Sequence, residues 1–316
     1  MTEKQELNKK RSFKKFMLGH RGESGFIGKF FMYLLLIGIS FIFLYPILKM
    51  LSKSFMGLED LMDPSVIWIP SKVVSSNYSK ASEVLNFWKA LGDSLKVGIW
   101  PTLCSVISSS LIGYGFAHFN FPGKKIWMAI LIAVFLLPTM LMSIPTYVIF
   151  KNLNMLGSLK SYIYPALTGF GLRQSVFILI FYQFFKVIPR ELSESAEMDG
   201  ASELGIFIRI AIPMSIPAFI ICMLYSFVWY WNETVLSTTY FQGNITTLQM
   251  ALSNFEHTYR EMFPSGSIGI GSAAESFNQG VLFAGTILTI LPLLLLYAFT
   301  QKWFVESADR SGIAGD

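Results

Sequence analysis

Six long apolar segments constrain the fold of this chain more than any other feature. They lie at about residues 30–51, 94–117, 126–150, 166–187, 213–236 and 280–303. A helix needs about 20 apolar residues to cross a bilayer. Hydrophobic residues make up 53% of the chain and charged residues only 14%, which is too apolar for a soluble protein of this size. The sequence therefore predicts an all-α polytopic membrane protein with six transmembrane helices. The fourth segment is the least regular, because Arg173 and Gln174 lie near its start.

Two features of the apolar segments limit other interpretations. The first segment is too long for a secretory signal, and no small-residue cleavage site follows it, so we expect it to stay in the membrane. The two cysteines, Cys104 and Cys222, fall inside predicted spans and indicate no disulfide framework. In the second span, Ser105, Ser109 and Gly113 recur every four residues and predict a close helix contact.

The basic residues are distributed unequally between the two sides of the predicted bundle. With six spans, one side receives the basic N-terminal tail (1–29), the loops at 118–125 and 188–212 and the C-terminal tail (305–316). Cytoplasmic loops carry the excess of Lys and Arg, so both termini are predicted to be cytoplasmic. The basic tail is typical of topology control and anionic lipid binding, and it does not indicate a nucleic-acid partner.

The loop at 188–212 carries signals for two short helices rather than a plain connection. Pro189 suits the first position of a helix, and Glu191 and Glu194 follow in its first turns, where the helix dipole favours negative charge. Gly200 is suited to the left-handed conformation that ends a helix. We therefore expect a helix–glycine–helix knuckle. The alternative is one amphipathic helix lying on the membrane surface.

The same loop resembles the cytoplasmic EAA loop of ABC importer permeases. That pattern is E-[AS]-A-x-x-D-G-A-x5-F-x-x-I-x-[LI]-P-x3-P, and residues 194–217 fill every fixed position. Ser195 and Ile212 stand where Ala and Leu are usual. In that family the knuckle inserts into a cleft of the ATPase subunit. The resemblance thus implies that the ATPase-coupling residues are Glu194, Ser195, Ala196, Asp199, Gly200 and Ala201.

Further motifs are similar to those of carbohydrate-uptake permeases of the maltose-transporter type. They include Asn77-Tyr78, Gly113-Tyr-Gly-Phe-Ala-His, Leu137-Pro138, Ile144-Pro145-x-Tyr147, Trp231-Asn232-Glu233 and Leu291-Pro292. Two positions depart from the family: Asp93 replaces the usual Asn, and the tail from Glu306 to Asp316 lacks the usual glycine-rich ending.

This resemblance implies a type I ABC importer permease fold for residues 30–304, in a prokaryotic cytoplasmic (inner) membrane. It implies five kinds of partner: a second homologous permease, two ABC ATPase subunits, an extracytoplasmic solute-binding protein, a carbohydrate substrate and the membrane lipid. ATP and Mg would bind the partner ATPase subunits, and no cofactor is expected on this chain.

A sugar path needs aromatic platforms and uncharged hydrogen-bonding groups. Suitable side chains lie late in the fifth span and around the outer end of the third: Tyr147, Asn152, Trp229, Tyr230, Trp231 and Asn232. The alternative is that these aromatics belong to the belt at the membrane interface.

The outer loop at 237–279 is long, rich in Gly and Ser, and carries aromatics at intervals. In maltose-type permeases the corresponding loop reaches into the binding protein. The resemblance therefore implies a probe loop whose candidate residues are Phe255, Tyr259, Phe263, Gly266 and Gly269. The alternative is a lid that packs over the outer ends of the spans.

Several chemistries lack a sequence signature. There is no G-x4-G-K-[ST] loop for ATP, no catalytic constellation, and no metal spacing among His20, His118 and His257. The chain is therefore expected to be a transport subunit and not an enzyme, without a metal site. Two alternatives stay open: an ABC permease for a non-sugar solute, and a stand-alone secondary sugar carrier, although we find no inverted repeat typical of such carriers.

Overall fold

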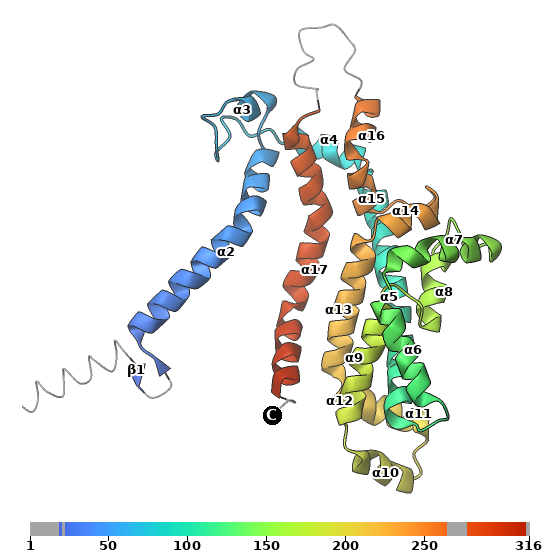
Figure 1. Ribbon diagram of the computed structural model, residues 1–316. Helices are drawn as coiled ribbons and strands as arrows, with labels where there is room; N and C mark the ends of the chain where they lie inside the picture. Colours follow the sequence, from blue (N-terminus) through green and yellow to red (C-terminus); the bar gives the residue numbers. More distant parts are fainter. Residues whose placement is uncertain (1–18, 21–22, 264–276, 314–316) are drawn as a thin grey trace, which may run out of the picture. The chain divides into compact units, whose positions relative to one another are not determined.

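The protein is described by a computed structural model that covers residues 19–20, 23–263 and 277–313. The chain divides into two compact units (Figure 1). One comprises Met1–Asn77 with Asn278–Ala284, and the other comprises Tyr78–Phe277 with Gly285–Asp316. Helices form most of the described chain in each unit, which confirms the predicted all-α class, with one additional pair of two-residue strands.

The first unit is built around a long apolar helix. Strand β1 (Gly19–His20) pairs antiparallel with β2 (Glu23–Ser24), and helices α2 (Phe26–Ser54) and α3 (Leu58–Met62) follow. The apolar window of α2 has a mean hydropathy of 2.3 and is 0% buried. Helix α2 is therefore long and apolar enough to cross a bilayer, as predicted for the first span.

The C-terminal end of α2 is capped and packed by residues that are distant in the sequence. Asn77 Nδ2 donates hydrogen bonds of 2.9 Å to the carbonyl oxygens of Ser54 and Met56, which lie where a helix leaves its last carbonyls without partners. Gly280, near the start of α17 (Gln279–Ile313), packs against the same turn. A Cβ at this position would lie 2.7 Å from the Met56 oxygen, so only glycine permits this approach.

The second unit packs its helices around α5 (Phe87–His118), which contacts α9 (Gln174–Val187) and α13 (Ile216–Asn232) extensively. Figure 1 shows these three running side by side. Their interface is an apolar core that includes Val106, Phe177, Phe181 and Cys222. The remaining helices of this unit are α4 (Ser76–Val84, which starts in the first unit), α6 (Lys124–Leu136), α7 (Ser143–Asn152), α8 (Lys160–Thr168), α10 (Arg190–Met198), α11 (Glu203–Ile206), α12 (Ile212–Met214), α14 (Val235–Phe241), α15 (Leu248–Ser253), α16 (Phe255–Met262) and most of α17.

The small residues of α5 make the close contact that their spacing predicts. Ser105 and Ser109 are fully buried, and a Cβ on Gly113 would lie 2.7 Å from the Phe181 Cβ and 2.9 Å from the Tyr182 backbone nitrogen. Because backbone atoms cannot rotate away, Gly113 fixes how closely α5 and α9 approach each other. This packing confirms the predicted small-residue face of the second span.

The third predicted span (126–150) is interrupted rather than continuous. Helix α6 ends at Leu136, a 3-10 turn η1 (Thr139–Met142) follows, and α7 then begins. Leu137 has ψ 128°, the extended conformation that a following proline imposes, and Pro138 has no N–H with which to continue the helix. The break therefore follows directly from Leu137-Pro138.

The fourth and fifth predicted spans are also divided. Helices α8 and α9 are separated by Gly169 (φ 89°) and Arg173 (φ 50°), so the segment 166–187 does not form one helix. The fifth span is preceded by a π-helical turn η2 (Phe207–Ala211), and it bends by 80° between Met214 and Ile216.

Only part of the predicted six-helix arrangement is therefore confirmed. Among the described residues, three helices are long and apolar enough to cross a membrane, namely α2, α5 and Gln279–Trp303 of α17, or four if the bent pair Glu203–Met214 and Ile216–Asn232 forms one span. Helix α17 continues to Ile313, so residues 305–313 extend the last helix.

Candidate functional site

The helix–glycine–helix knuckle is present as predicted. Helix α10 follows Pro189, and Gly200 adopts φ 80° directly after its end. The Gly200 N–H donates to the Glu197 carbonyl and the Ala201 N–H donates to the Ala196 carbonyl, both at 2.9 Å. These two bonds form a Schellman motif, which satisfies the last carbonyls of the helix and requires a left-handed residue. The chain therefore turns sharply at Gly200.

The second half of the knuckle begins with a side-chain cap. Ser202 Oγ accepts a hydrogen bond of 3.2 Å from the Gly205 N–H at the start of α11, as N-cap serines do. Phe207 then buries its ring against Tyr114 and Phe185, with ring centroids 5.0 and 6.0 Å away. This aromatic anchor joins the knuckle to α5 and α9.

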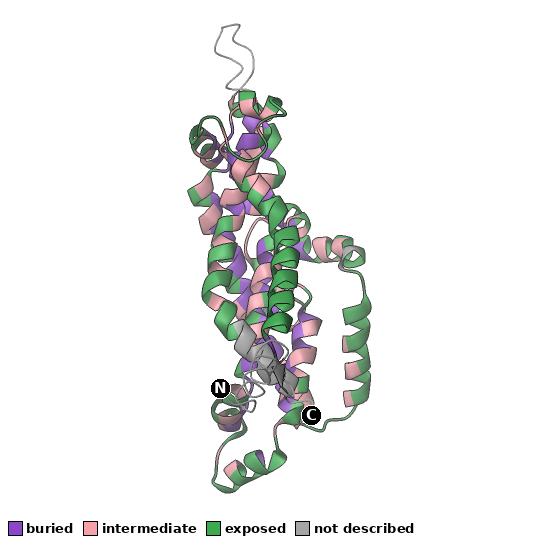
Figure 2. Ribbon diagram, turned by 90° about the vertical axis from the view of Figure 1, so that its left-hand side faces the viewer, coloured by how far each residue is buried: buried purple, intermediate pink, exposed green. Residues whose placement is uncertain are grey.

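The outer face of the knuckle is largely exposed. Figure 1 shows α10 beyond the ends of α9 and α12, and Figure 2 shows the same segment, at the lower end, as largely exposed. Glu194, Ser195, Asp199 and Gly200 are exposed, and Ala196 and Ala201 are half-buried. Two large apolar side chains beside them, Met198 and Leu204, are 89% and 61% exposed. Met198 and Leu204 are thus exposed apolar side chains on a surface that is otherwise small and acidic.

The candidate substrate-path residues divide into interior and accessible groups. Tyr230 and Trp231 are 1% and 2% exposed. The Tyr230 hydroxyl accepts a hydrogen bond of 3.1 Å from the Leu172 N–H, and the Trp231 ring stacks on Phe227. Both side chains are therefore packed within the protein, and their place on a substrate path stays a prediction. Sequence hydropathy does not distinguish an interior aromatic from one that faces a cavity.

The other path residues keep polar groups or ring faces near the surface. Asn232 is exposed, and its Oδ1 accepts a hydrogen bond of 3.2 Å from Gln249 Nε2. The Tyr147 hydroxyl accepts one of 3.3 Å from Gln242 Nε2. Trp229 is half-buried, and the Arg173 guanidinium lies 5.2 Å from its ring centre. Asn152, at the end of α7, is exposed.

Part of the outer loop is helical and packed. Phe255 and Tyr259, on α16, are 0% and 1% exposed, and the Phe255 ring lies over Gly285 of α17. These two aromatics stabilise the base of the loop and are not available to a partner in this arrangement. Phe263 is half-buried against Tyr259. Gly266 and Gly269 lie outside the described residues.

One structural residue was not recognised as such from the sequence. Gln174, which marks an irregularity in the fourth predicted span, is 1% exposed. Its Nε2 donates to Ser108 Oγ at 2.6 Å and to the Ala166 carbonyl at 2.9 Å, and its Oε1 accepts from the Gly171 N–H at 2.7 Å. The amide thus links α5, α8 and α9 where the chain breaks. The available signal is an amide shortly after two glycines, Gly169 and Gly171, within an apolar segment.

The long apolar helices define a polytopic integral membrane protein. The chain belongs to the family of binding-protein-dependent transport system inner membrane components, whose family model matches residues 109–309. It is therefore a membrane transport component rather than an enzyme.

Relatives with assigned names cover most of the chain. The arabinooligosaccharides transport system permease protein AraQ of Bacillus subtilis is 28% identical over 284 residues, covering 88% of this chain and 92% of that protein. The polygalacturonan/rhamnogalacturonan transport system permease protein YtcP of the same organism is 29% identical, covering 89% and 96%. A chain from the crystal structure of a bacterial ABC transporter involved in alginate import matches with TM-score 0.68 and 19% identity, covering 90% of this chain and 100% of that chain. This last match confirms the fold.

Proposed function

We propose that this chain is a permease subunit of an ATP-driven importer that moves a carbohydrate, specifically an oligosaccharide, across the cytoplasmic membrane. Family membership supports the importer class, and the names of AraQ and YtcP support a carbohydrate substrate. A second homologous permease completes the path, and both termini of this chain lie in the cytoplasm.

The exposed knuckle is the observation that carries the proposal. Its two short helices meet at Gly200 and present Glu194, Asp199 and Met198 outward, while Phe207 joins them to the α5–α9 core. A partner that moves α10 therefore also pulls on the core helices. We assign that partner as the ATPase, which binds ATP and Mg, so that nucleotide-driven closure rotates the attached helices.

The substrate path is proposed to use four of the six candidate residues. We place Trp229, Asn232, Tyr147 and Asn152 along it, because they are at least partly accessible, whereas Tyr230 and Trp231 support it from behind. Amide pairs such as Asn232–Gln249 offer uncharged donors and acceptors, which suit sugar hydroxyls better than they suit a strongly charged solute.

The loop after α16 is proposed to contact the solute-binding protein. The buried Phe255 and Tyr259 hold its base, and Phe263 packs half-buried against Tyr259. Cysteines introduced within residues 263–272 are expected to crosslink to the binding protein, and shortening the loop is expected to slow transport while docking remains. The absence of any crosslink, or transport at the normal rate after shortening, would show that the loop is only a lid.

Reconstitution tests the proposal. The chain, its second permease and its ATPase are inserted into proteoliposomes, and uptake of labelled arabino- and galacturono-oligosaccharides is measured with binding protein outside. Uptake is expected to require ATP inside, and the chain alone is expected to move no sugar. Saturable, ATP-independent uptake by the chain alone would instead identify a secondary carrier.

A further inference from the structure

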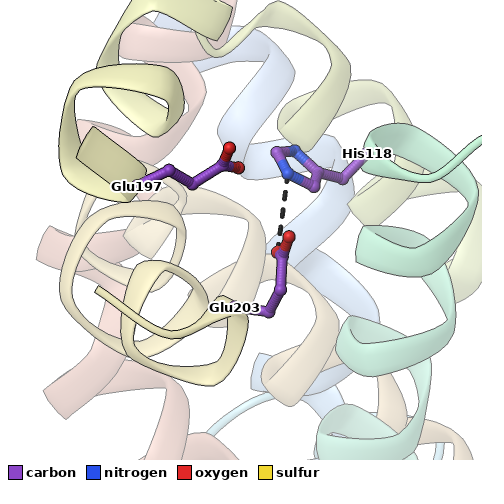
Figure 3. Close-up of side chains that lie close together, drawn as sticks. All are labelled: His118, Glu197 and Glu203. Atoms are coloured by element: carbon purple, nitrogen blue, oxygen red, sulfur yellow. Dashed lines mark ion pairs between the residues drawn. The ribbon is translucent and has the colours of Figure 1, made fainter. Parts of the chain in front are cut away.

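Three side chains that the predicted functions leave unassigned converge at the base of the knuckle. His118 ends α5, Glu197 lies on α10 and Glu203 begins α11, and Figure 3 shows their polar groups turned toward one another. Their ligand atoms all lie within 4.8 Å of one another. None occupies a fixed position of the EAA pattern, so ATPase docking does not account for them.

The spacing between His118 and Glu203 suits an intervening ion. Nε2 of His118 lies 3.6 Å from Oε2 of Glu203, which is longer than a normal hydrogen bond of about 2.7–3.2 Å. Two ligands at about 2.0–2.2 Å from a tetrahedral zinc ion are separated by roughly 3.3–3.6 Å. The observed separation falls at the upper end of this range.

Tyr114 provides a second, independent observation. Its ring stacks on the His118 imidazole with centroids 5.0 Å apart and an interplanar angle of 11°, which orients the imidazole. Tyr114 is 7% exposed, and its hydroxyl has no hydrogen-bond partner within the described chain. A buried hydroxyl normally has a partner, and a water molecule bound to an ion at this site would supply one.

We propose that His118, Glu197 and Glu203 form a binding site for a divalent first-row transition metal such as Zn²⁺, with water completing the coordination. An imidazole nitrogen favours these metals over Mg²⁺ and Ca²⁺, which prefer oxygen ligands. The ion offsets the charge of the two carboxylates. It also ties the end of α5 to both helices of the knuckle, on either side of the turn at Gly200.

Metal binding itself is the test, and it does not depend on the coupling role of the knuckle. The full-length chain is purified in lipid nanodiscs with a histidine-free tag, and Zn²⁺ is titrated in competition with a fluorescent chelator at neutral pH. We expect one Zn²⁺ bound with a Kd below about 10 µM. His118→Ala and Glu203→Gln are expected to weaken binding by about tenfold or more.

Two variants serve as matched controls. Glu194→Gln changes an exposed carboxylate on the same helix, and His257→Ala removes a surface histidine paired with Glu261 at 3.5 Å; both are expected to leave the affinity unchanged. Size-exclusion profiles confirm that each variant is folded. An affinity that stays within about twofold in both cluster variants, a Kd above about 10 µM, or equal competition by Mg²⁺ would overturn the proposal.

Discussion

At the residue scale, Gly200 is constrained by its backbone and not by its surroundings. Its φ of 80° is left-handed, yet a Cβ there would meet nothing within 4 Å. A left-handed backbone costs most residues about 1–2 kcal/mol, and Asn tolerates it better than Leu does. Gly200→Leu is expected to lower ATP-dependent uptake several-fold at normal membrane abundance, and Gly200→Asn is expected to retain most of it. Equal uptake by the two variants would show that the turn is not required.

Gln174 is the residue whose loss is expected to affect stability most directly. Gln174→Ala leaves the Gly171 N–H and the polar groups around Ser108 without their amide partner. Each buried group left unpaired costs about 1–3 kcal/mol, so the thermal unfolding midpoint of the purified protein should fall by several degrees. Gln183→Ala, at an exposed position of the same helix, is the control and should have little effect.

At the element scale, α5 offers a matched pair of glycines. A Cβ on Gly113 would lie 2.9 Å from the Tyr182 backbone nitrogen, whereas a Cβ on Gly115 would meet nothing within 4 Å. Gly113→Ala must therefore push α5 and α9 apart, and it is expected to lower the unfolding midpoint. Gly115→Ala should be neutral or slightly stabilising, because alanine favours a helix by up to about 1 kcal/mol over glycine. The opposite order of midpoints would contradict the close packing of α5 and α9.

The same scale shows what the sequence predicts well. Hydropathy located α2, α5 and most of α17, and the pattern around Gly200 predicted the knuckle, because both signals are local. Hydropathy did not predict the break at Leu137-Pro138 or the one between Gly169 and Arg173, since both breaks lie inside continuous apolar runs. It also did not distinguish the buried Tyr230 and Trp231 from accessible neighbours, because burial depends on which helices pack together.

At the scale of the whole molecule, motif spacing does not predict which residues from distant parts of the chain lie close together. His118 lies far along the chain from Glu197 and Glu203, and no short motif connects them, so the sequence predicted no metal site. Folding brings them together because Phe207 anchors the knuckle beside the end of α5. The surface that we assign to the ATPase and the proposed metal site are therefore neighbours on one loop.

The central claim, that the knuckle docks on the ATPase, is tested most directly by crosslinking in the assembled transporter. The two native cysteines are first removed as Cys104→Ser and Cys222→Ala. Met198→Cys is then the test variant, and Ile126→Cys on α6 is the control. Both positions are exposed, at 89% and 67%. A short bifunctional reagent is expected to join position 198 to the ATPase, and the yield is expected to change when ATP is added, while position 126 gives no such product. Equal yields at the two positions, or no product at position 198 in an active complex, would contradict the account.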